Sequence, residues 1–273
     1  MRDTALELVL RRDRIVVAVA LATIAALAWG YLLWLAADMD MGGMRMSGFR
    51  MIPGAAGLMT PAIAPWRWFE FVLVFVMWFV MMIGMMTPSA APMILIYARV
   101  GRQALTHGAP FAATGWFVAG YLFVWAGFSL TASAVQWALE RATLLDEAMR
   151  GTSRVMGGVV LIAAGIYQWT TLKDRCLRGC QAPLTFIQQQ GGFRRDPPGA
   201  LLLGAKHGAY CLGCCWMLMA LLFVGGVMNL LWIAAIAIFV LAEKAMPPGW
   251  QISRISGLGL VASGGWLLLR TAA

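Results

Sequence analysis

The stretch KHGAYCLGCCWMLM, residues 206–219, runs directly into the apolar sequence ALLFV at residues 220–224. A run this long and this apolar predicts a helix. On a helix with 3.6 residues per turn, one histidine and three cysteines then lie within an arc of roughly 80–100°. They are His207, Cys211, Cys214 and Cys215. Thiolates and imidazole bind Cu(I), Zn(II) and iron–sulfur clusters. The stretch therefore predicts a helix with a metal site on one face. Helix packing by small, apolar cysteines is the alternative.

The composition around this stretch indicates a membrane protein. The chain has 273 residues, of which 61% are hydrophobic and 12% charged, whereas soluble domains carry about 25% charged residues. We therefore predict an all-α fold, a polytopic transmembrane helical bundle in the lipid bilayer. The formal net charge of +9 does not indicate nucleic acid as a partner, because no nucleic-acid-binding module is recognisable.

Hydropathy predicts about seven spans. Residues 1–14 form a basic cytoplasmic lead, and 15–37 form a signal-anchor helix that is too long for a cleaved signal peptide. Residues 38–68 form a Met-rich external loop, and 69–273 form a six-helix membrane domain that carries the metal site. The spans are expected at 15–37, 69–98, 111–139, 155–172, 201–224, 228–242 and 255–269.

Charge distribution predicts the orientation. With a cytoplasmic N-terminus and seven spans, 14 of the 21 lysine and arginine residues fall on the cytoplasmic side. This agrees with the rule that cytoplasmic loops are enriched in these residues. The C-terminus is then external.

The external loop offers a second, weaker metal site made of thioethers. Its methionines are Met39, Met41, Met44 and Met46. Thioethers select Cu(I) and need no deprotonation. The loop is rich in Gly and Pro, so we expect little regular structure. Packing of the loop against the helix ends is the alternative.

The second span carries two pairs of methionines at a spacing of four, so each pair stacks on one helical face. The pairs are Met81 with Met85 and Met82 with Met86. Pro88 and Pro92 should kink or loosen the helix beside them. By depth, the pairs and the cysteine cluster lie at one level of the bilayer, but the sequence does not show whether the two helices touch. The pairs are candidate copper ligands that carry Cu(I) inward. Core packing is the alternative.

Two further thiols, Cys176 and Cys180, follow the fourth span at a spacing of four. Arg175 and Arg178 should favour their thiolate form, so we expect these cysteines to support the metal site. The chain has five cysteines, an odd number, and the predicted external loops contain none. Reduced thiols are therefore expected rather than a disulfide framework.

The remaining spans carry weaker signals. The third contains few polar groups and is interpreted as an ordinary packing helix. Glycines in the fourth and seventh spans predict close helix contact. Glu243 and Lys244, at the end of the sixth span, are interpreted as an interfacial ion pair. A proton or metal relay is the alternative.

Four segments together resemble a bacterial family of unknown function described as predicted metal-binding integral membrane proteins. They are MMIGMMTPSAAP at 81–92, CLRGCQAP at 176–183, YCLGCCW at 210–216 and AEK at 242–244. The likeness covers about residues 69–249 and implies a polytopic protein of the bacterial inner membrane with a metal site. The Met-x-x-x-Met spacing is also similar to that of eukaryotic high-affinity copper transporters, over this short motif only.

These observations favour Cu(I) binding, for transport or for delivery to a cuproenzyme, with a metallochaperone or cuproenzyme as partner. Cu(I) held by one thiolate and neutral thioethers carries no net charge. Zn(II) held by three thiolates and a histidine carries a net negative charge, and burying charge in the membrane is costly. Zinc is therefore the weaker candidate. One alternative is a membrane thiol–disulfide oxidoreductase that uses the paired cysteines; another is a non-catalytic assembly subunit. We expect a binding or transport protein rather than an enzyme.

Overall fold

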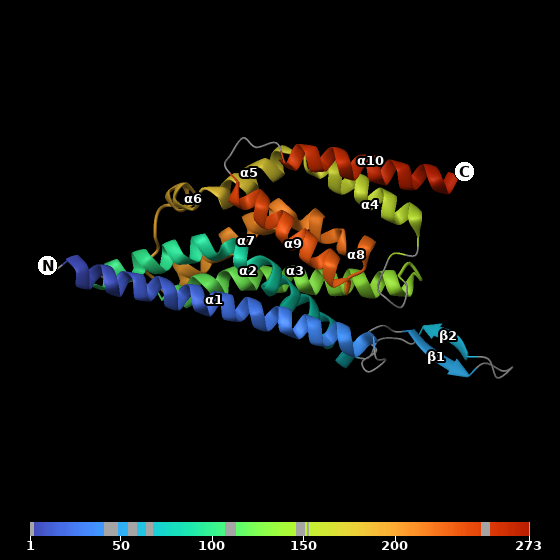
Figure 1. Cartoon of the computed structure of the whole chain (residues 1–273), viewed down its shortest axis with the longest axis horizontal. Coiled ribbons are helices and arrows are strands. Elements are labelled where there is room, and N and C mark those ends of the chain that lie inside the picture. The colour runs from blue at the N-terminus through green and yellow to red at the C-terminus, as the bar shows by residue number, and fades with distance from the viewer. Residues whose placement is uncertain are drawn as a thin grey trace.

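The computed structural model describes residues 3–40, 49–53, 59–63, 68–106, 113–145, 151, 153–246 and 252–272. The helices lie along one long axis, and the start of α1 and the end of α10 are at opposite ends of it (Figure 1). The first half contains α1 (Asp3–Asp40), β1 (Phe49–Pro53), β2 (Met59–Ile63), α2 (Trp68–Thr106) and α3 (Thr114–Arg141). The second half contains α4 (Arg154–Tyr167), α5 (Thr171–Gln181), α6 (Pro183–Gln189), α7 (Pro197–Ala220), α8 (Leu222–Gly225), α9 (Leu230–Ala245) and α10 (Ile252–Ala272).

Five helical segments among the described residues are long and apolar enough to cross a membrane. They are Ile15–Ala37, Trp68–Ala104, Thr114–Arg141, Pro197–Gly225 and Ile252–Thr271. A sixth arises if α4 and α5, bent by 65°, are taken as one broken span. The structure thus supports the helical membrane fold and five or six of the seven predicted spans. The remaining one is α9, which has 16 residues and is shorter than a typical span of about 20.

The bend between α4 and α5 has a local cause. The Thr170 hydroxyl accepts a hydrogen bond from the Lys173 backbone N–H at 3.3 Å, which makes Thr170 the N-cap of a new helix. The predicted fourth span, 155–172, is therefore not one continuous helix. Its second part, α5, brings Cys176 and Cys180 across the bundle to α7, against which it packs.

Helix α1 begins at Asp3 and contains the predicted first span, Ile15–Ala37. The prediction of little regular structure in the loop after it is wrong. The loop at 38–68 contains an antiparallel hairpin in which Phe49 pairs with Ile63. Met39 lies in the last turn of α1, and Met41, Met44 and Met46 lie outside the described residues.

Glycines allow close helix contacts, as the sequence predicts for the fourth and seventh spans. The Gly158 and Gly264 pair joins α4 to α10, where a Cβ on Gly264 would lie 2.7 Å from the Gly158 carbonyl oxygen. A closer approach joins α3 to α7. A Cβ on Gly204 would lie 1.9 Å from the Phe117 carbonyl oxygen, which leaves no room for any side chain. This contact fixes α7 against α3.

The two prolines of the second span do not interrupt it. Pro88 and Pro92 lie inside α2, which is helical from Trp68 to Thr106. Between them, the Ser89 hydroxyl donates to the Met86 carbonyl oxygen at 2.9 Å. The helix thus continues through both prolines, and a side chain adds a hydrogen bond to the backbone between them.

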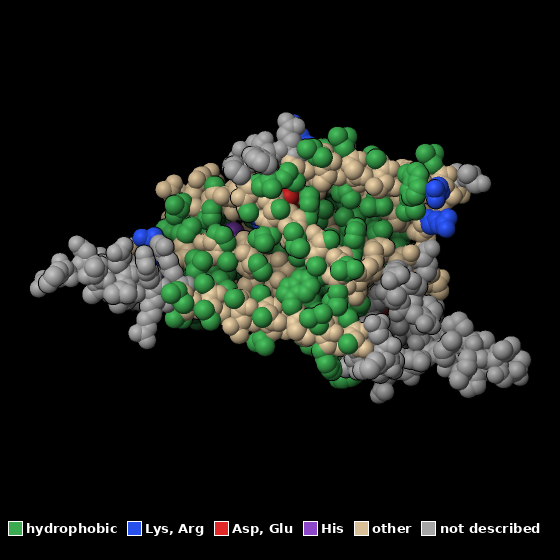
Figure 2. Space-filling view, viewed as in Figure 1, with side chains coloured by type: hydrophobic (Ala, Val, Ile, Leu, Met, Phe, Trp, Pro, Cys, Tyr) green, Lys and Arg blue, Asp and Glu red, His purple; other side chains and the backbone are tan. Residues whose placement is uncertain are grey.

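Apolar side chains lie on the surface and several polar ones lie in the interior, as expected for a protein surrounded by lipid. The face in Figure 2 is rich in hydrophobic side chains, with Lys and Arg near its ends. Large apolar residues such as Phe123, Leu231 and Leu269 are exposed, while several polar and charged side chains are buried. The buried ones lie on several helices, among them α3, α5, α7 and α9.

Candidate metal centre

The four predicted ligands of α7 share the buried side of this helix. His207, Cys211, Cys214 and Cys215 are each at most 2% exposed. The helix begins where the Asp196 carboxylate accepts a hydrogen bond from the Gly199 N–H at 2.7 Å, a normal N-cap. The predicted single-face cluster is therefore present. All five cysteines of the chain are free thiols.

The Met-rich helix touches this cluster. Cys215 Sγ lies 4.0 Å from Met86 Sδ. Tyr121, on α3, holds the same turn of α2 through a hydrogen bond from its hydroxyl to the Met86 carbonyl oxygen at 3.3 Å. Met81, Met82 and Met85 are also buried. Among the described contacts, Met86 is the methionine that reaches a thiol, so the two predicted motifs meet there.

The thiols of α5 approach α7 from another side. Gly213 leaves room for Cys176, because a Cβ at this glycine would lie 2.6 Å from Cys176 Sγ. Cys180, like Cys176, packs against the buried core that contains Cys211, Cys214 and Cys215. The Tyr167 hydroxyl donates to the Gly213 carbonyl oxygen, which ties the end of α4 to the same turn. The structure thus brings all five thiols together.

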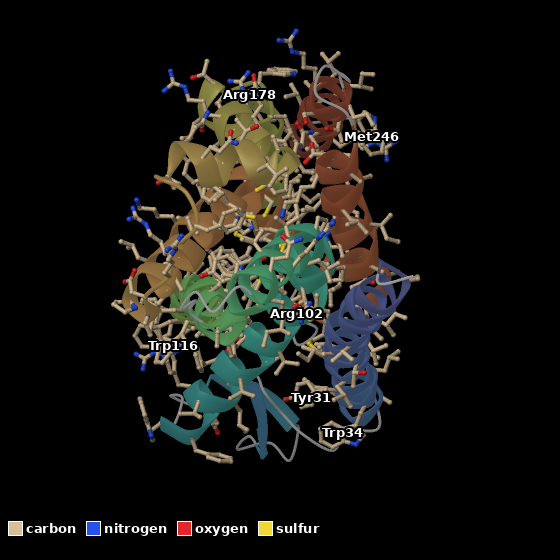
Figure 3. All side chains as sticks on the ribbon, turned by 90° about the vertical axis from the view of Figure 1, so that its left-hand side faces the viewer. Tyr31, Trp34, Arg102, Trp116, Arg178 and Met246 are labelled. Carbon is tan, nitrogen blue, oxygen red and sulfur yellow. The ribbon has the colours of Figure 1, made fainter. Side chains whose placement is uncertain are left out.

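A lysine that the sequence did not place in the site completes it. Lys244 Nζ lies 2.9 Å from Cys211 Sγ and donates to Ser89 Oγ at 3.0 Å. The Tyr121 hydroxyl lies 3.2 Å from the same sulfur. An ammonium group beside a thiol compensates the charge of its thiolate form. Arg175 and Arg178, predicted to act on Cys176 and Cys180, are both exposed, and Lys244 is the cation that contacts a thiol among the described hydrogen bonds. Arg178 lies at the edge of the bundle (Figure 3).

The neighbouring Glu243 has a different partner. Its two carboxylate oxygens accept hydrogen bonds from Lys173 Nζ at 2.9 and 2.8 Å, and Ser253 Oγ donates to it at 2.7 Å. Both side chains of this ion pair are at most 2% exposed. The predicted interfacial pair of Glu243 with Lys244 is therefore wrong. Consecutive residues on a helix point in different directions, so each charge finds its own buried partner.

His207 stands one turn before Cys211, among aromatic rings. Its ring centroid lies 5.5 Å from that of Phe186, 5.8 Å from that of Tyr121 and 6.1 Å from that of Phe117. Its Nδ1 is buried without a hydrogen-bond partner in the described structure. Nδ1 of His207 therefore makes no hydrogen bond in the described structure, and the side chains around the ring are aromatic.

The present side-chain arrangement is not a finished coordination shell. Among the residues that the structure describes, no three His, Cys, Asp or Glu side chains are placed to hold one metal ion. The reason is local, because Cys214 Sγ and Cys215 Sγ each lie 3.0 Å from the Cys211 carbonyl oxygen. These thiols point back along their own helix, and rotation about χ1 is needed to turn them toward a common ion. The donor set still fits a soft ion, since it is made of thiols and a thioether.

Lys244, Tyr121 and the Lys173–Glu243 pair were missed as site residues. A signal for Lys244 was present in the sequence. Charged side chains within a membrane-spanning bundle are rare and mark functional sites, and Glu243-Lys244 closes an otherwise uncharged apolar run. Tyr121 gives no such signal, because its role depends on how α3 packs against α2 and α7.

The fold and the centre define a class of protein: a bundle of membrane-length helices around a buried site of thiols, one thioether and a lysine. Sulfur atoms cluster inside the bundle in Figure 3. The model of the PpoB2 family, described as copper chaperone, matches residues 75–267. The match covers more than half of the chain, which therefore belongs to this family. No curated protein and no solved structure matches the chain.

Proposed function

We propose that this protein binds Cu(I) in the membrane through Cys211, Cys214 and Cys215 together with Met86, and passes it to a partner. The observation that carries the proposal is the 4.0 Å separation between Cys215 Sγ and Met86 Sδ. With metal–sulfur bonds of about 2.3 Å, an ion between these atoms would bind both at an angle of about 120°. Cys176, Cys180 and His207 support the same site.

Thioether coordination, rather than charge, favours copper over zinc. Lys244 adds a positive charge beside Cys211, so Zn(II) with three thiolates and Cu(I) with two thiolates would both leave a neutral site. Charge alone therefore does not separate the two metals. A methionine at the centre of the site does, since soft thioethers select Cu(I). Membership of a copper chaperone family agrees with this choice.

Thiol–disulfide exchange is the second candidate. Cys211 and Cys214 have the C-x-x-C spacing of redox proteins, and Cys180 packs against the same core. That reaction has no use for the thioether of Met86. We therefore prefer copper binding, for which every group at the centre has a role.

We place the protein in the bacterial inner membrane with the N-terminus in the cytoplasm and the C-terminus outside. The thiols then lie toward the cytoplasmic side, and the methionines before α2 lie outside. The opposite ends of α1 and α10 in Figure 1 suit an odd number of crossings, with α9 as a short seventh span. A metallochaperone or a cuproenzyme is the expected partner.

Reporter fusions test this topology. A reporter inserted at Gly43 should be active only as an external domain, and the same reporter at Gly191 only as a cytoplasmic one. The expectation rests on the excess of lysine and arginine on the inner side. If both insertions report the same compartment, the proposed topology is wrong.

Replacing Met86 by leucine tests the thioether ligand. Met86→Leu conserves volume, so the fold should persist, but one soft donor is lost. We expect Cu(I) affinity to fall by about 10- to 100-fold. Removing a group that only hydrogen-bonds to a metal ligand already causes a loss of this size, and removing a ligand itself should cost at least as much. Competition with a coloured Cu(I) chelator measures it.

The matched control is Met77→Leu. Met77 is fully buried in the same helix but lies nine positions from Met86, which is about 13 Å along the axis. This variant should bind Cu(I) as the unmodified protein does. Equal Cu(I) affinity in Met86→Leu and Met77→Leu would mean that Met86 packs in the core and is not a copper ligand. The double change Met81→Leu and Met85→Leu tests in the same way whether the pair Met81 and Met85 contributes to Cu(I) binding.

A further inference from the structure

Polar side chains line the buried face of α3 from one end of the membrane to the other. We call them the α3 polar face: Tyr121, Ser129, Ser133, Gln136 and Glu140. All five are buried, at 0–3% exposure. The opposite side of α3 exposes apolar residues such as Phe123 and Leu130. The interpretation of this span as an ordinary packing helix did not include this face. The span has few polar groups, but these five are buried, whereas Thr131 is exposed.

Helix formation alone does not require this polar face. Ser129 Oγ donates to the Trp125 carbonyl oxygen and Ser133 Oγ to the Ser129 carbonyl oxygen, each at 2.8 Å. Each hydroxyl thus uses its proton within α3, and its oxygen can still act as a ligand. Polar groups inside a membrane are costly and mark the paths of ions or protons.

Helix α2 packs against α3 and contacts the α3 polar face at two points. At one end, Trp78 Nε1 donates to Gln136 Oε1 at 2.8 Å. At the other end, the Tyr121 hydroxyl donates to the Met86 carbonyl oxygen. Met82 is one helical turn from both Trp78 and Met86, so it shares their face. We call this contact between the two helices the seam. Gln136 and Tyr121 of α3 lie at its two ends, and Met82, a buried methionine of α2, lies between them along α2.

The seam has the length of a membrane crossing and ends at the thiols. Tyr121 and Glu140 are 19 positions apart, about 28 Å of helix, against a hydrocarbon core of about 30 Å. At the inner end Tyr121 lies 3.2 Å from Cys211 Sγ. At the outer end Gln136 Nε2 donates to the Glu140 carboxylate at 3.0 Å.

We infer that the seam between α2 and α3 is the route by which Cu(I) reaches the thiols from the Glu140 end of the bundle. This inference rests on the proposed copper function. The Glu140 carboxylate attracts the cation, and the oxygens of Ser129 and Ser133 replace part of its hydration shell. The thioether of Met82 then binds the ion transiently. The thiols then hold it. Several weak ligands in a row suit conduction, because each can release the ion to the next. Copper stays Cu(I) throughout, so no electron is exchanged.

Ser133 offers the test, since it lies in the middle of the route and away from the thiols. Ser133→Val removes the hydroxyl and fills its space, and Ser133→Ala removes the hydroxyl alone. Cu(I) is offered to intact spheroplasts for short times, and copper bound to the purified protein is then measured. We expect loading in Ser133→Val to be at least about fivefold slower, and loading in Ser133→Ala to be slowed less.

The matched control is Thr131→Val on the same helix. Thr131 makes the same type of hydrogen bond, from Oγ1 to the Gly127 carbonyl oxygen at 3.0 Å, but is exposed. It should load like the unmodified protein. In detergent, where copper in solution can reach both ends of the helical bundle, all variants should reach equal copper content. In inverted vesicles, where copper arrives from the thiol side, Ser133→Val should also load normally.

The outcomes separate the two claims. Equal loading rates of Ser133→Val, Ser133→Ala and Thr131→Val in spheroplasts would overturn the route, and so would a slow rate from both sides. Absence of copper from every form in detergent, the unmodified protein included, would instead refute the copper function itself.

Discussion

Replacing Lys173 by methionine is expected to lower the free energy of unfolding by about 3–5 kcal/mol, because it leaves a buried charge without its partner. Lys173 Nζ contacts both carboxylate oxygens of Glu243, and this pair links α5 to α9. Without the lysine, Glu243 keeps only Ser253 Oγ as a side-chain donor among its described contacts. Thermal unfolding of the purified protein in detergent measures the loss.

Two controls isolate the ion pair. The double change Lys173→Met and Glu243→Leu should recover most of the stability, since replacing a whole buried pair by apolar residues is often neutral. Lys206→Met removes a lysine whose described hydrogen bond, to Gln190 Oε1 at 3.0 Å, is exposed. It should change stability by no more than about 0.5 kcal/mol. A Lys173→Met protein as stable as Lys206→Met would mean that the pair does not link the helices.

Loss of copper from a Cys211→Ser, Cys215→Ser double variant is the second large effect that we expect. Cys211 Sγ faces Lys244 Nζ and the Tyr121 hydroxyl, and Cys215 Sγ faces Met86 Sδ. Serine is similar in size and can keep the hydrogen bonds, but its hard oxygen is a poor ligand for Cu(I). Copper bound after anaerobic purification should fall from about one ion per chain to near zero.

The fold control and the ligand control are separate measurements. The double variant should unfold at nearly the same temperature as the unmodified protein, because hydrogen bonds and volume are conserved. Cys176→Ser, which changes a supporting thiol packed against Gly213, should keep part of the copper. If the double variant retains as much copper as the unmodified protein, the α7 thiols are not the ligands.

Local patterns predicted the long helices and the shared face of α7. A 3.6-residue period is enough to place His207 and three cysteines on one side of α7, and hydropathy is enough to find the long spans. Glycine pairs such as Gly158 with Gly264 could be expected for the same reason, since small residues let helices approach.

Contacts between distant segments could not be predicted in this way. Met86 meets Cys215 across 129 positions, and Lys244 meets Cys211 across 33. The first contact depends on α3, which holds α7 through Gly204 and α2 through Tyr121, and the second depends on the packing of α9 against α7. A charge at a helix end also has two possible environments, water or the bundle interior. Hydropathy favours water for Lys173 and Lys244, whereas the bend at Thr170 and the packing of α9 place both inside.

X-ray absorption at the copper edge of the Cu(I)-loaded protein tests the central claim most directly. We predict a first shell of about four sulfur atoms and no nitrogen or oxygen, as three cysteines and one thioether would provide. In Met86→Leu one sulfur should be lost from that shell. A shell made of nitrogen and oxygen, or a protein that retains no copper under reducing anaerobic conditions, would contradict the account.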